Sequence, residues 1–180
     1  MTAVDDPHRA PLDVEMLQAF IAELASKSDL VWVQGDDVPA RPVWSVWHDD
    51  AVTIVTGGVE QPNPGLTDGG TATLILRSKE NRARQVATRS NVRQLTPGSD
   101  EWLAAVKALH PKRLNAPDGE KQPERWARES AIWVLRPTGE PIEGPGQQSD
   151  GSHRAEPVAT DATTLTHHPF HAGRATKKRR

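Results

Sequence analysis

Residues 41–56 read RPVWSVWHDDAVTIVT, which is two β-prone runs separated by a polar turn. Successive side chains of a strand point to opposite faces, so each run divides into two sides. Both sides of the first run are largely apolar, and β-branched residues dominate the second. The stretch predicts a β-hairpin that is buried on both faces, as it would be in a barrel or a dimer interface. The two sides of its first arm are Val43, Ser45 and Trp47 against Pro42, Trp44 and Val46.

Working outward from this hairpin, the sequence predicts a mainly antiparallel sheet with helices at its margins. Apolar residues at helical spacing mark two amphipathic helices, and glycines and prolines make residues 57–70 a loop. We therefore expect an α+β, mainly β fold, a split β-barrel with peripheral helices. The predicted helices are 12–27, 100–110 and 123–126, and the predicted strands beyond the hairpin are 30–33, 71–77, 82–95 and 131–135.

Composition divides the 180 residues into three parts. Residues 1–11 form a flexible leader and residues 12–137 one domain, because sizeable apolar residues become rare after Pro137. Residues 138–180 are predicted to be disordered, since they cannot bury enough surface to offset chain entropy. Sixteen of the 22 basic and 19 of the 24 acidic residues precede Thr138, so this part has a net charge of −3. Its overall field gives no reason to expect nucleic acid. The final KKRR is either a targeting or nucleic-acid anchor, or a solvated terminus with no specific role.

Several classes of site are excluded by residue type. The chain has no cysteine, which rules out disulfides, thiolate nucleophiles and cysteine-based metal centres. His167, His168 and His171 fall in the predicted disordered tail, where a metal site would be unorganised, and we assign no metal. No run of apolar residues is long enough to cross a bilayer, so we expect a cytoplasmic protein. No catalytic triad or carboxylate pair stands out, and no catalytic residue is assigned.

The order of elements and several local sequences resemble the pyridoxamine 5′-phosphate oxidase-like split β-barrel family. The similarity covers residues 12–137 and depends on RPVWSVW, the strand ending at Thr56, the hairpin TATLILRSKENRARQVA, the helix start PGSDEW and a closing apolar strand. GGVEQPNPGL, LILRSKENRARQV and RLN resemble an actinobacterial branch of that family.

The resemblance implies a homodimer that binds flavin mononucleotide (FMN), or a deazaflavin coenzyme, in a groove shared by two subunits. It implies that Arg41 and Thr56 help to hold the phosphate or the ribityl chain, since guanidinium and hydroxyl groups suit a phosphate dianion. A solvated arginine at a strand edge is the alternative interpretation of Arg41. Trp44 or Trp47 would flank the flat ring, and the alternative is that both fill the barrel or the dimer interface.

The chain departs from the family after Thr56. Many members place an Arg-Lys pair there, whereas this chain has GGVEQPNPGL. Three explanations stay open: Gly57 and Gly58 present backbone N–H groups to the phosphate, Arg77 and Lys79 reach it from the next strand, or the cofactor site has been lost.

Three functional hypotheses follow. The leading one is a flavin-binding protein, with hydride transfer to or from a small molecule as its possible chemistry, because the flavin supplies the reactivity and the protein supplies position and electrostatics. The second is a cofactor-free split barrel that acts as a binding or interaction module. The third is a nucleic-acid-associated protein that uses the hairpin arginines and the basic terminus. The sequence disfavours the third hypothesis, because no aromatic residues alternate with the cations of the hairpin to stack on bases. The same cations suit a solvated outer face of the hairpin. Those cations are Arg77, Lys79, Arg82, Arg84, Arg89 and Arg93.

Overall fold

The structure is a computed structural model that describes residues 13–36, 38–114 and 116–144. The predicted leader and most of the predicted disordered tail, with its histidines and KKRR, lie outside the described residues.

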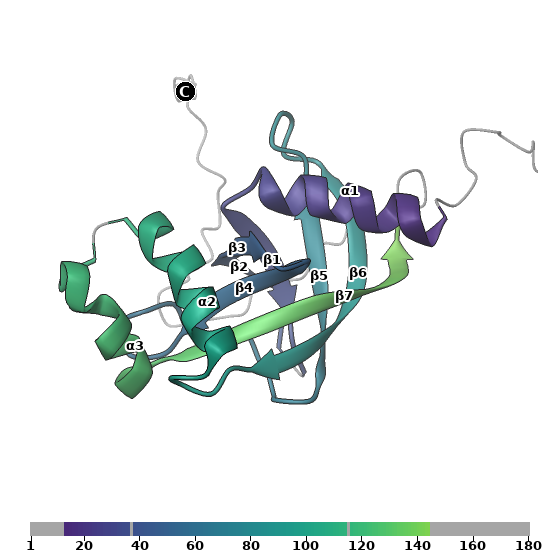
Figure 1. Ribbon diagram of the computed structural model, residues 1–180. Coiled ribbons are helices and arrows are strands. Elements are labelled where there is room, and N and C mark those ends of the chain that lie inside the picture. The colour runs from purple at the N-terminus through teal and green to yellow at the C-terminus, as the bar shows by residue number, and fades with distance from the viewer. Residues whose placement is uncertain (1–12, 37, 115, 145–180) are drawn as a thin grey trace, which may run out of the picture. The chain divides into compact units, whose positions relative to one another are not determined.

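Within these described ranges, seven antiparallel strands form a single sheet in the order β2-β1-β5-β6-β7-β4-β3 (Figure 1). Three α-helices accompany the strands within the described residues, together with short 3-10 turns at His110–Lys112 and Gly119–Lys121. The strands are β1 (Leu30–Gln34), β2 (Arg41–Trp44), β3 (Val46–His48), β4 (Ala51–Thr56), β5 (Thr71–Arg77), β6 (Arg84–Gln94) and β7 (Ala131–Glu143). The helices are α1 (Val14–Ser26), α2 (Asp100–Leu109) and α3 (Gln122–Glu129).

The two edge strands of the sheet, β2 and β3, are consecutive in the chain and are separated only by Ser45. The chain bends there, so its first half pairs with β1 and its second half with β4. The bend brings both edges of the sheet together and nearly closes a barrel, and the two edge strands have only four and three residues. The predicted split barrel with peripheral helices is confirmed.

The β3–β4 hairpin forms as the sequence predicts, with Val46 opposite Thr53 and His48 opposite Ala51. Asp49 and Asp50 make its turn with φ angles of +50° and +52°. Two successive residues at positive φ define a type I′ turn, whose twist matches that of the strands, and aspartate tolerates this conformation better than most residues.

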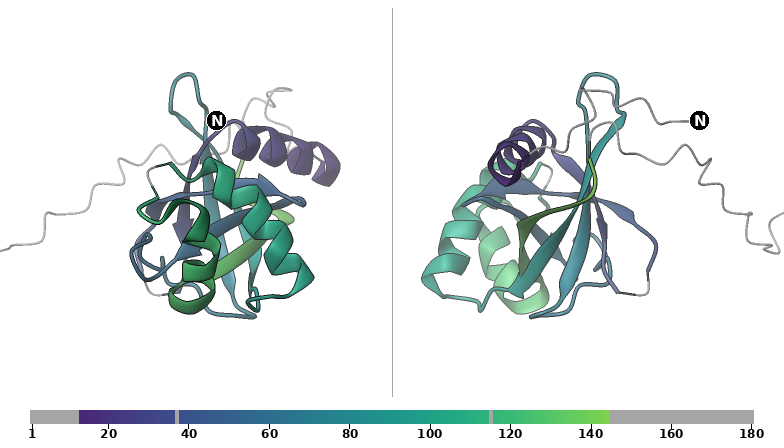
Figure 2. Two further views of the ribbon diagram at one scale, coloured as in Figure 1. Left: turned by 60° about the vertical axis from the view of Figure 1, so that its left-hand side comes forward. Right: turned by 90° about the vertical axis from the view of Figure 1, so that its right-hand side faces the viewer.

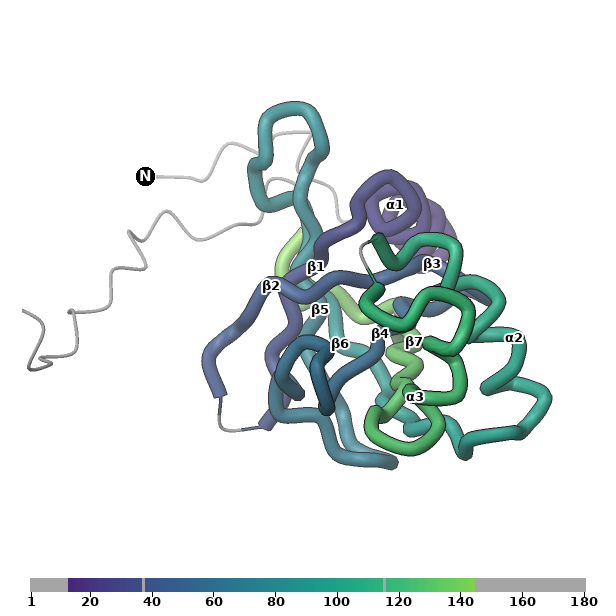
Figure 3. The backbone as a smooth tube through the Cα atoms, turned by 90° about the vertical axis from the view of Figure 1, so that its left-hand side faces the viewer, coloured from purple at the N-terminus to yellow at the C-terminus, as the bar shows by residue number. Residues whose placement is uncertain are grey.

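Two apolar clusters lie on the two sides of the sheet, which explains the dense apolar content of β4. Val52 and Ile54 pack inside the barrel against Leu17 and Ile21 of α1. Val55, on the other side of the strand, packs outside the barrel with residues of α2 and α3. Figures 2 and 3 show α1 across one end of the barrel, and α2 and α3 together beside β4 and β7. The outer cluster consists of Val55, Leu95, Trp102, Ala105, Val106, Leu109, Trp126 and Ile132, with Trp44, Val46 and Val134 against it.

The helices begin where capping chemistry predicts. Asp13 caps α1 by accepting from the Met16 N–H at 2.7 Å, and Ser99 caps α2 by accepting from the Trp102 N–H at 3.2 Å. None of the helices in the described part of the chain is both long and apolar enough to span a membrane.

The last strand differs from its predicted extent. The sequence predicts a strand over 131–135, whereas β7 continues to Glu143. Pro137 and Pro141 pair with Ser90 and Thr88 next to register shifts of the β6–β7 ladder. Prolines are tolerated at such irregularities because the missing N–H is not needed there, and a sequence pattern alone does not reveal them.

Candidate functional site

An aromatic and apolar surface lies on the outside of β2, β1 and β5. Trp44 pairs with Leu30, and Pro42, Trp32 and Ile75 form the next row across the three strands. Paired residues of a sheet point to the same side, and the side chains between these rows belong to the barrel interior. Leu30 is 57% exposed, and Trp32 and Ile75 are half-buried and belong to neither apolar cluster. We call Leu30, Trp32, Pro42, Trp44 and Ile75 the outer tryptophan face.

A guanidinium group covers part of this face. The Arg77 Cζ atom lies 4.9 Å from the centroid of the Trp32 ring, within the range of a cation–π contact. Arg77 ends β5 and is exposed. The cation is held over an aromatic ring and stays accessible to an anion.

The other predicted cations lie apart from Arg77. Arg41 is exposed and pairs with Val33 towards the end of β1, whereas Arg77 lies beyond Ile75, towards the beginning of β1. β5 ends at Arg77, so Lys79 is an exposed residue of the β5–β6 turn, which projects beyond the barrel in Figure 2. The sequence suggested that Arg77 and Lys79 project from the same strand. They do not, because only Arg77 belongs to β5.

The Thr56 side chain is buried in the core and hydrogen-bonded there. The residue is 2% exposed, and its Oγ1 accepts a hydrogen bond from the Trp133 Nε1–H at 2.9 Å. A buried indole N–H needs such a partner. The hydroxyl thus has a structural role at the junction of β4 and β7.

Gly57 and Gly58 make the reversal after β4 with φ angles of +87° and +59°. The Gly57 N–H donates to the Gln61 carbonyl at 3.0 Å. A Cβ atom on Gly58 would lie 3.2 Å from the Glu129 carbonyl oxygen, so glycine also allows the close approach of α3. The predicted phosphate nest therefore lacks the Gly57 amide.

Gln61 lies beside three of the predicted site residues, Trp44, Thr56 and Gly57. Its Oε1 accepts from the Trp44 N–H at 2.7 Å, and its Nε2 donates to the carbonyls of Trp44 at 2.8 Å and Val55 at 3.1 Å. The amide satisfies backbone groups of both β2 and β4 at the bend where the barrel closes. Trp44, Thr56 and Gly57 are thus close together, while Arg41 and Arg77 lie elsewhere on the sheet.

A buried carboxylate, which the sequence analysis did not identify, fixes the same loop to α3. The Glu60 side chain is 2% exposed and accepts from Arg113 Nε at 2.9 Å, Arg125 Nη2 at 2.9 Å and Trp126 Nε1 at 3.0 Å. Asp118 also accepts from Arg125, at 2.8 Å from Nε. The sequence signal was weak, because these groups are up to 66 residues apart.

These contacts set the charge states of the cluster. Burial raises the pKa of Glu60, but the hydrogen bonds from Trp126, Arg125 and Arg113 outweigh it and hold that pKa below its ordinary value. The hydrogen bond to Asp118 is the main reason why the pKa of Arg125 is raised. Gln122 is fully buried beside them in α3, and neither atom of its amide has a hydrogen-bond partner among the described residues.

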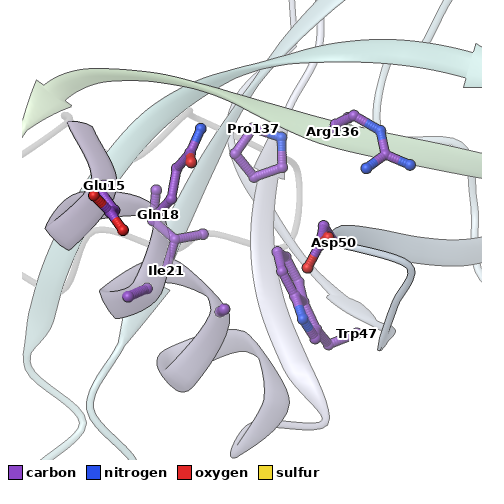
Figure 4. Close-up of a pocket in the computed structure, with 9 residues that line it drawn as sticks. Glu15, Gln18, Ile21, Trp47, Asp50, Arg136 and Pro137 are labelled. Carbon is purple, nitrogen blue, oxygen red and sulfur yellow. The ribbon is translucent and has the colours of Figure 1, made fainter.

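In the described part of the chain, three cavities adjoin Arg136 of β7. The first, of about 490 Å³, lies between α1 and the β3–β4 hairpin. Figure 4 shows Gln18 and Ile21 of α1 on one side of it and Trp47 and Asp50 on the other. The second, of about 300 Å³, lies beside α2, and the third, of about 480 Å³, borders Gly69 and Gly70. Asp49 pairs with Arg136 at 2.9 Å between the first two. Among the described residues, no group of acidic or histidine side chains is arranged to hold a metal.

Comparisons with known proteins support the fold. No protein-family model and no curated protein sequence matches the chain. Among solved structures, the chain is similar to HutZ, the heme storage protein from Vibrio cholerae, with 10% identity and a TM-score of 0.50 over 67% of this chain and 89% of that one. It also matches the flavocytochrome Anf3 from Azotobacter vinelandii, with 17% identity and a TM-score of 0.42 over 90% of this chain and 88% of that one.

Proposed function

We propose that this chain is a split-barrel cofactor-binding protein whose ligand is a flat, anionic ring system of the flavin or heme type. The observation that carries the proposal is Arg77 stacked on Trp32 in the exposed outer tryptophan face. Aromatic rings offer a stacking surface, and an adjacent guanidinium group offers charge-assisted hydrogen bonds to phosphate or carboxylate. HutZ, which shares the fold, is a heme storage protein.

The residues present fit such a group in part. Trp32, Trp44 and Arg77 supply ring contact and positive charge, whereas Arg41 pairs with the inward-facing Val33 at the other end of β1 and lies apart from them. Thr56 and the Gly57 amide do not fit, because both already have partners within the fold. We propose FMN as the cofactor, with a deazaflavin coenzyme as the alternative, held by Arg77 of β5 beside Trp32. A bound flavin would supply hydride chemistry for an oxidoreductase acting on a small molecule, while the protein binds and orients the ring.

We further propose that the outer tryptophan face pairs with a second copy of the chain. Leu30, Trp32 and Ile75 leave apolar surface in water, and a stable interface buries about 800 Å² on each partner. Light scattering during gel filtration tests this: we expect a dimer mass, and a monomer mass for Leu30→Lys, which places a charge in the interface. A monomeric wild-type protein would contradict the homodimer.

The cofactor proposal is tested by titrating FMN, a deazaflavin coenzyme and hemin into the protein and its variants. Removing a charge-assisted hydrogen bond costs about 1.5–3 kcal/mol, so Arg77→Ala should weaken binding by about tenfold or more, whereas Arg41→Ala, at the other end of β1, should change it little. Lys107→Ala, on the exposed side of α2, is the matched control. Equal affinities for the wild type, Arg77→Ala and Lys107→Ala would refute the assigned role of Arg77, and a loss with Arg41→Ala as large as with Arg77→Ala would refute this placement of the cofactor.

A cofactor-free binding module is the second candidate. The observation that favours it is the loop after β4, where Thr56, Gly57 and Glu60 all have intramolecular partners. Nucleic-acid binding receives less support, since Arg84 pairs with Glu143 at 2.7 Å and Arg93 pairs with Glu101. Binding of DNA or RNA that weakens steeply with added salt would indicate a nucleic-acid-associated protein. A protein that binds none of the three cofactors would favour the cofactor-free binding module.

A further inference from the structure

The cavity beside α2 has the composition of a small-molecule site. Its walls include the apolar side chains of Leu95, Val134, Ala104 and Ala105. His48, Asp49, Arg93, Glu101 and Arg136 supply its polar part. A volume of about 300 Å³ is at the lower end of the range for ligand pockets, so the cavity suits a fragment-sized molecule. It shares no residue with the outer tryptophan face, and it does not depend on the proposed cofactor.

Thr53, which carries a buried hydroxyl group, is one of the residues that line this cavity. Thr53 is 1% exposed, and its Oγ1 has no hydrogen-bond partner among the described residues. Thr53 pairs with Val46 on one side and Val134 on the other, which places it on the outer side of the sheet near α2. A buried polar group without a partner is costly, and a valine of the same shape would avoid the cost. A hydrogen-bonding molecule in the cavity would give the hydroxyl the partner that it lacks within the fold.

The charges around the cavity favour an uncharged occupant. Arg93 pairs with Glu101, and Arg136 pairs with Asp49, so the two cations and two anions of the lining neutralise one another. An ionic ligand would have to disrupt one of these pairs. An uncharged molecule leaves both pairs intact and buries its apolar surface against Leu95 and Val134.

We propose that this cavity binds a small, uncharged, mainly apolar molecule with one hydroxyl or carbonyl group, which hydrogen-bonds to Thr53 Oγ1. Ala104, an exposed residue of α2, borders the cavity and leaves room for entry beside the helix. In the first cavity, none of the lining side chains is a buried polar group without a partner, which is why the inference concerns the second.

The test compares 4-methylphenol, toluene and benzoate as probes in NMR titrations of the full chain, with amide shifts of β4 and α2 as the readout. 4-Methylphenol should bind about three- to tenfold more tightly than toluene, which corresponds to one hydrogen bond, and more tightly than benzoate. Thr53→Val should remove the preference over toluene. Ala104→Leu should block both probes, while Ala108→Leu, on the same helix but outside the lining, should not.

Two results would overturn the proposal. One is the absence of saturable shifts at β4 and α2 with 4-methylphenol. The other is an unchanged preference for 4-methylphenol over toluene in Thr53→Val. Because Ala104 is exposed, Ala104→Leu tests the location even if Thr53→Val folds poorly.

Discussion

Replacing Glu60 by glutamine should destabilise the protein more than any single surface charge does. In the wild type, Oε1 accepts from Arg125 and Trp126, and Oε2 accepts from Arg113. Glutamine keeps one acceptor oxygen and replaces the other by an NH₂ group, which cannot accept. We expect the remaining oxygen to serve Arg125 and Trp126, because their side chains are the more buried, and Arg113, whose side chain is 31% exposed, to turn to water.

The magnitude follows from these contacts. The two retained bonds lose their charge-assisted character, at about 1 kcal/mol each, and the Arg113 bond is lost at under about 1 kcal/mol because water replaces it. Glu60→Gln should thus cost about 2–3 kcal/mol. Glu60→Ala should cost about 3–5 kcal/mol, the range for breaking a buried ion pair, and Asp118 should keep it towards the lower end by retaining Arg125.

Urea unfolding followed by circular dichroism and tryptophan fluorescence measures this effect. Glu101→Gln is the control, because the Glu101 and Arg93 side chains are 60% and 52% exposed and such a pair contributes at most about 1 kcal/mol. A Glu60→Gln variant no less stable than Glu101→Gln would refute the structural role assigned to the buried carboxylate.

Four further predictions concern other parts of the fold. The pKa of Glu60 is lowered from its ordinary 4.5, so the stability that its charge contributes is present above pH 4.5 and is lost as the pH falls through the lowered pKa. Urea unfolding at a series of pH values should therefore show the difference in stability between wild type and Glu60→Gln narrowing below pH 4.5. Asp50→Gly should raise the free energy of unfolding by about 0.5–1 kcal/mol, since glycine adopts a φ of +52° without strain. A lower melting temperature for the variant in thermal denaturation would contradict the type I′ turn. Gly35→Ala should be severely destabilising, because its Cβ would lie 2.0 Å from the Gly65 carbonyl oxygen. Gly69→Ala meets open space and should lower the free energy of unfolding by only about 1–2 kcal/mol, through its φ of +76°. Equal urea midpoints for the two variants would contradict the close approach of the Gly35 and Gly65 loops. Thr56→Val should cost about 1–3 kcal/mol by leaving the Trp133 N–H unpaired, and calorimetry that shows no loss would free Thr56 for the cofactor role.

The barrel was predictable because its signals are local. Alternation in residues 41–56 indicates a strand pair buried on both faces, and the structure shows the reason, with Val52 facing the barrel interior and Val55 facing the outer cluster. Capping residues and helical spacing likewise locate α1 and α2. By contrast, Pro137 and Pro141 disguise the second half of β7, because the irregularities that accommodate them involve β6, more than 40 residues earlier in the chain.

The candidate site was less predictable because it depends on tertiary partners. Arg77 is exposed and contacts a ring on a different strand, whereas Trp44 is half-buried and packs against the outer cluster. Nothing near Thr56 in the sequence announces that its hydroxyl partners Trp133, or that Glu60 pairs with two arginines contributed by distant segments. A lone glutamate in a glycine-rich loop has no periodic signal that would mark it as buried.

The proposal that this split barrel binds a cofactor is tested most directly by the absorbance spectrum of the purified protein, followed by equilibrium titration with FMN, a deazaflavin coenzyme and hemin. The account predicts saturable binding of one of them with quenching of tryptophan fluorescence, because the ring would lie against Trp32 and Trp44. A colourless protein that binds none of the three, with its fluorescence unchanged, would contradict the account and leave a binding module without a cofactor.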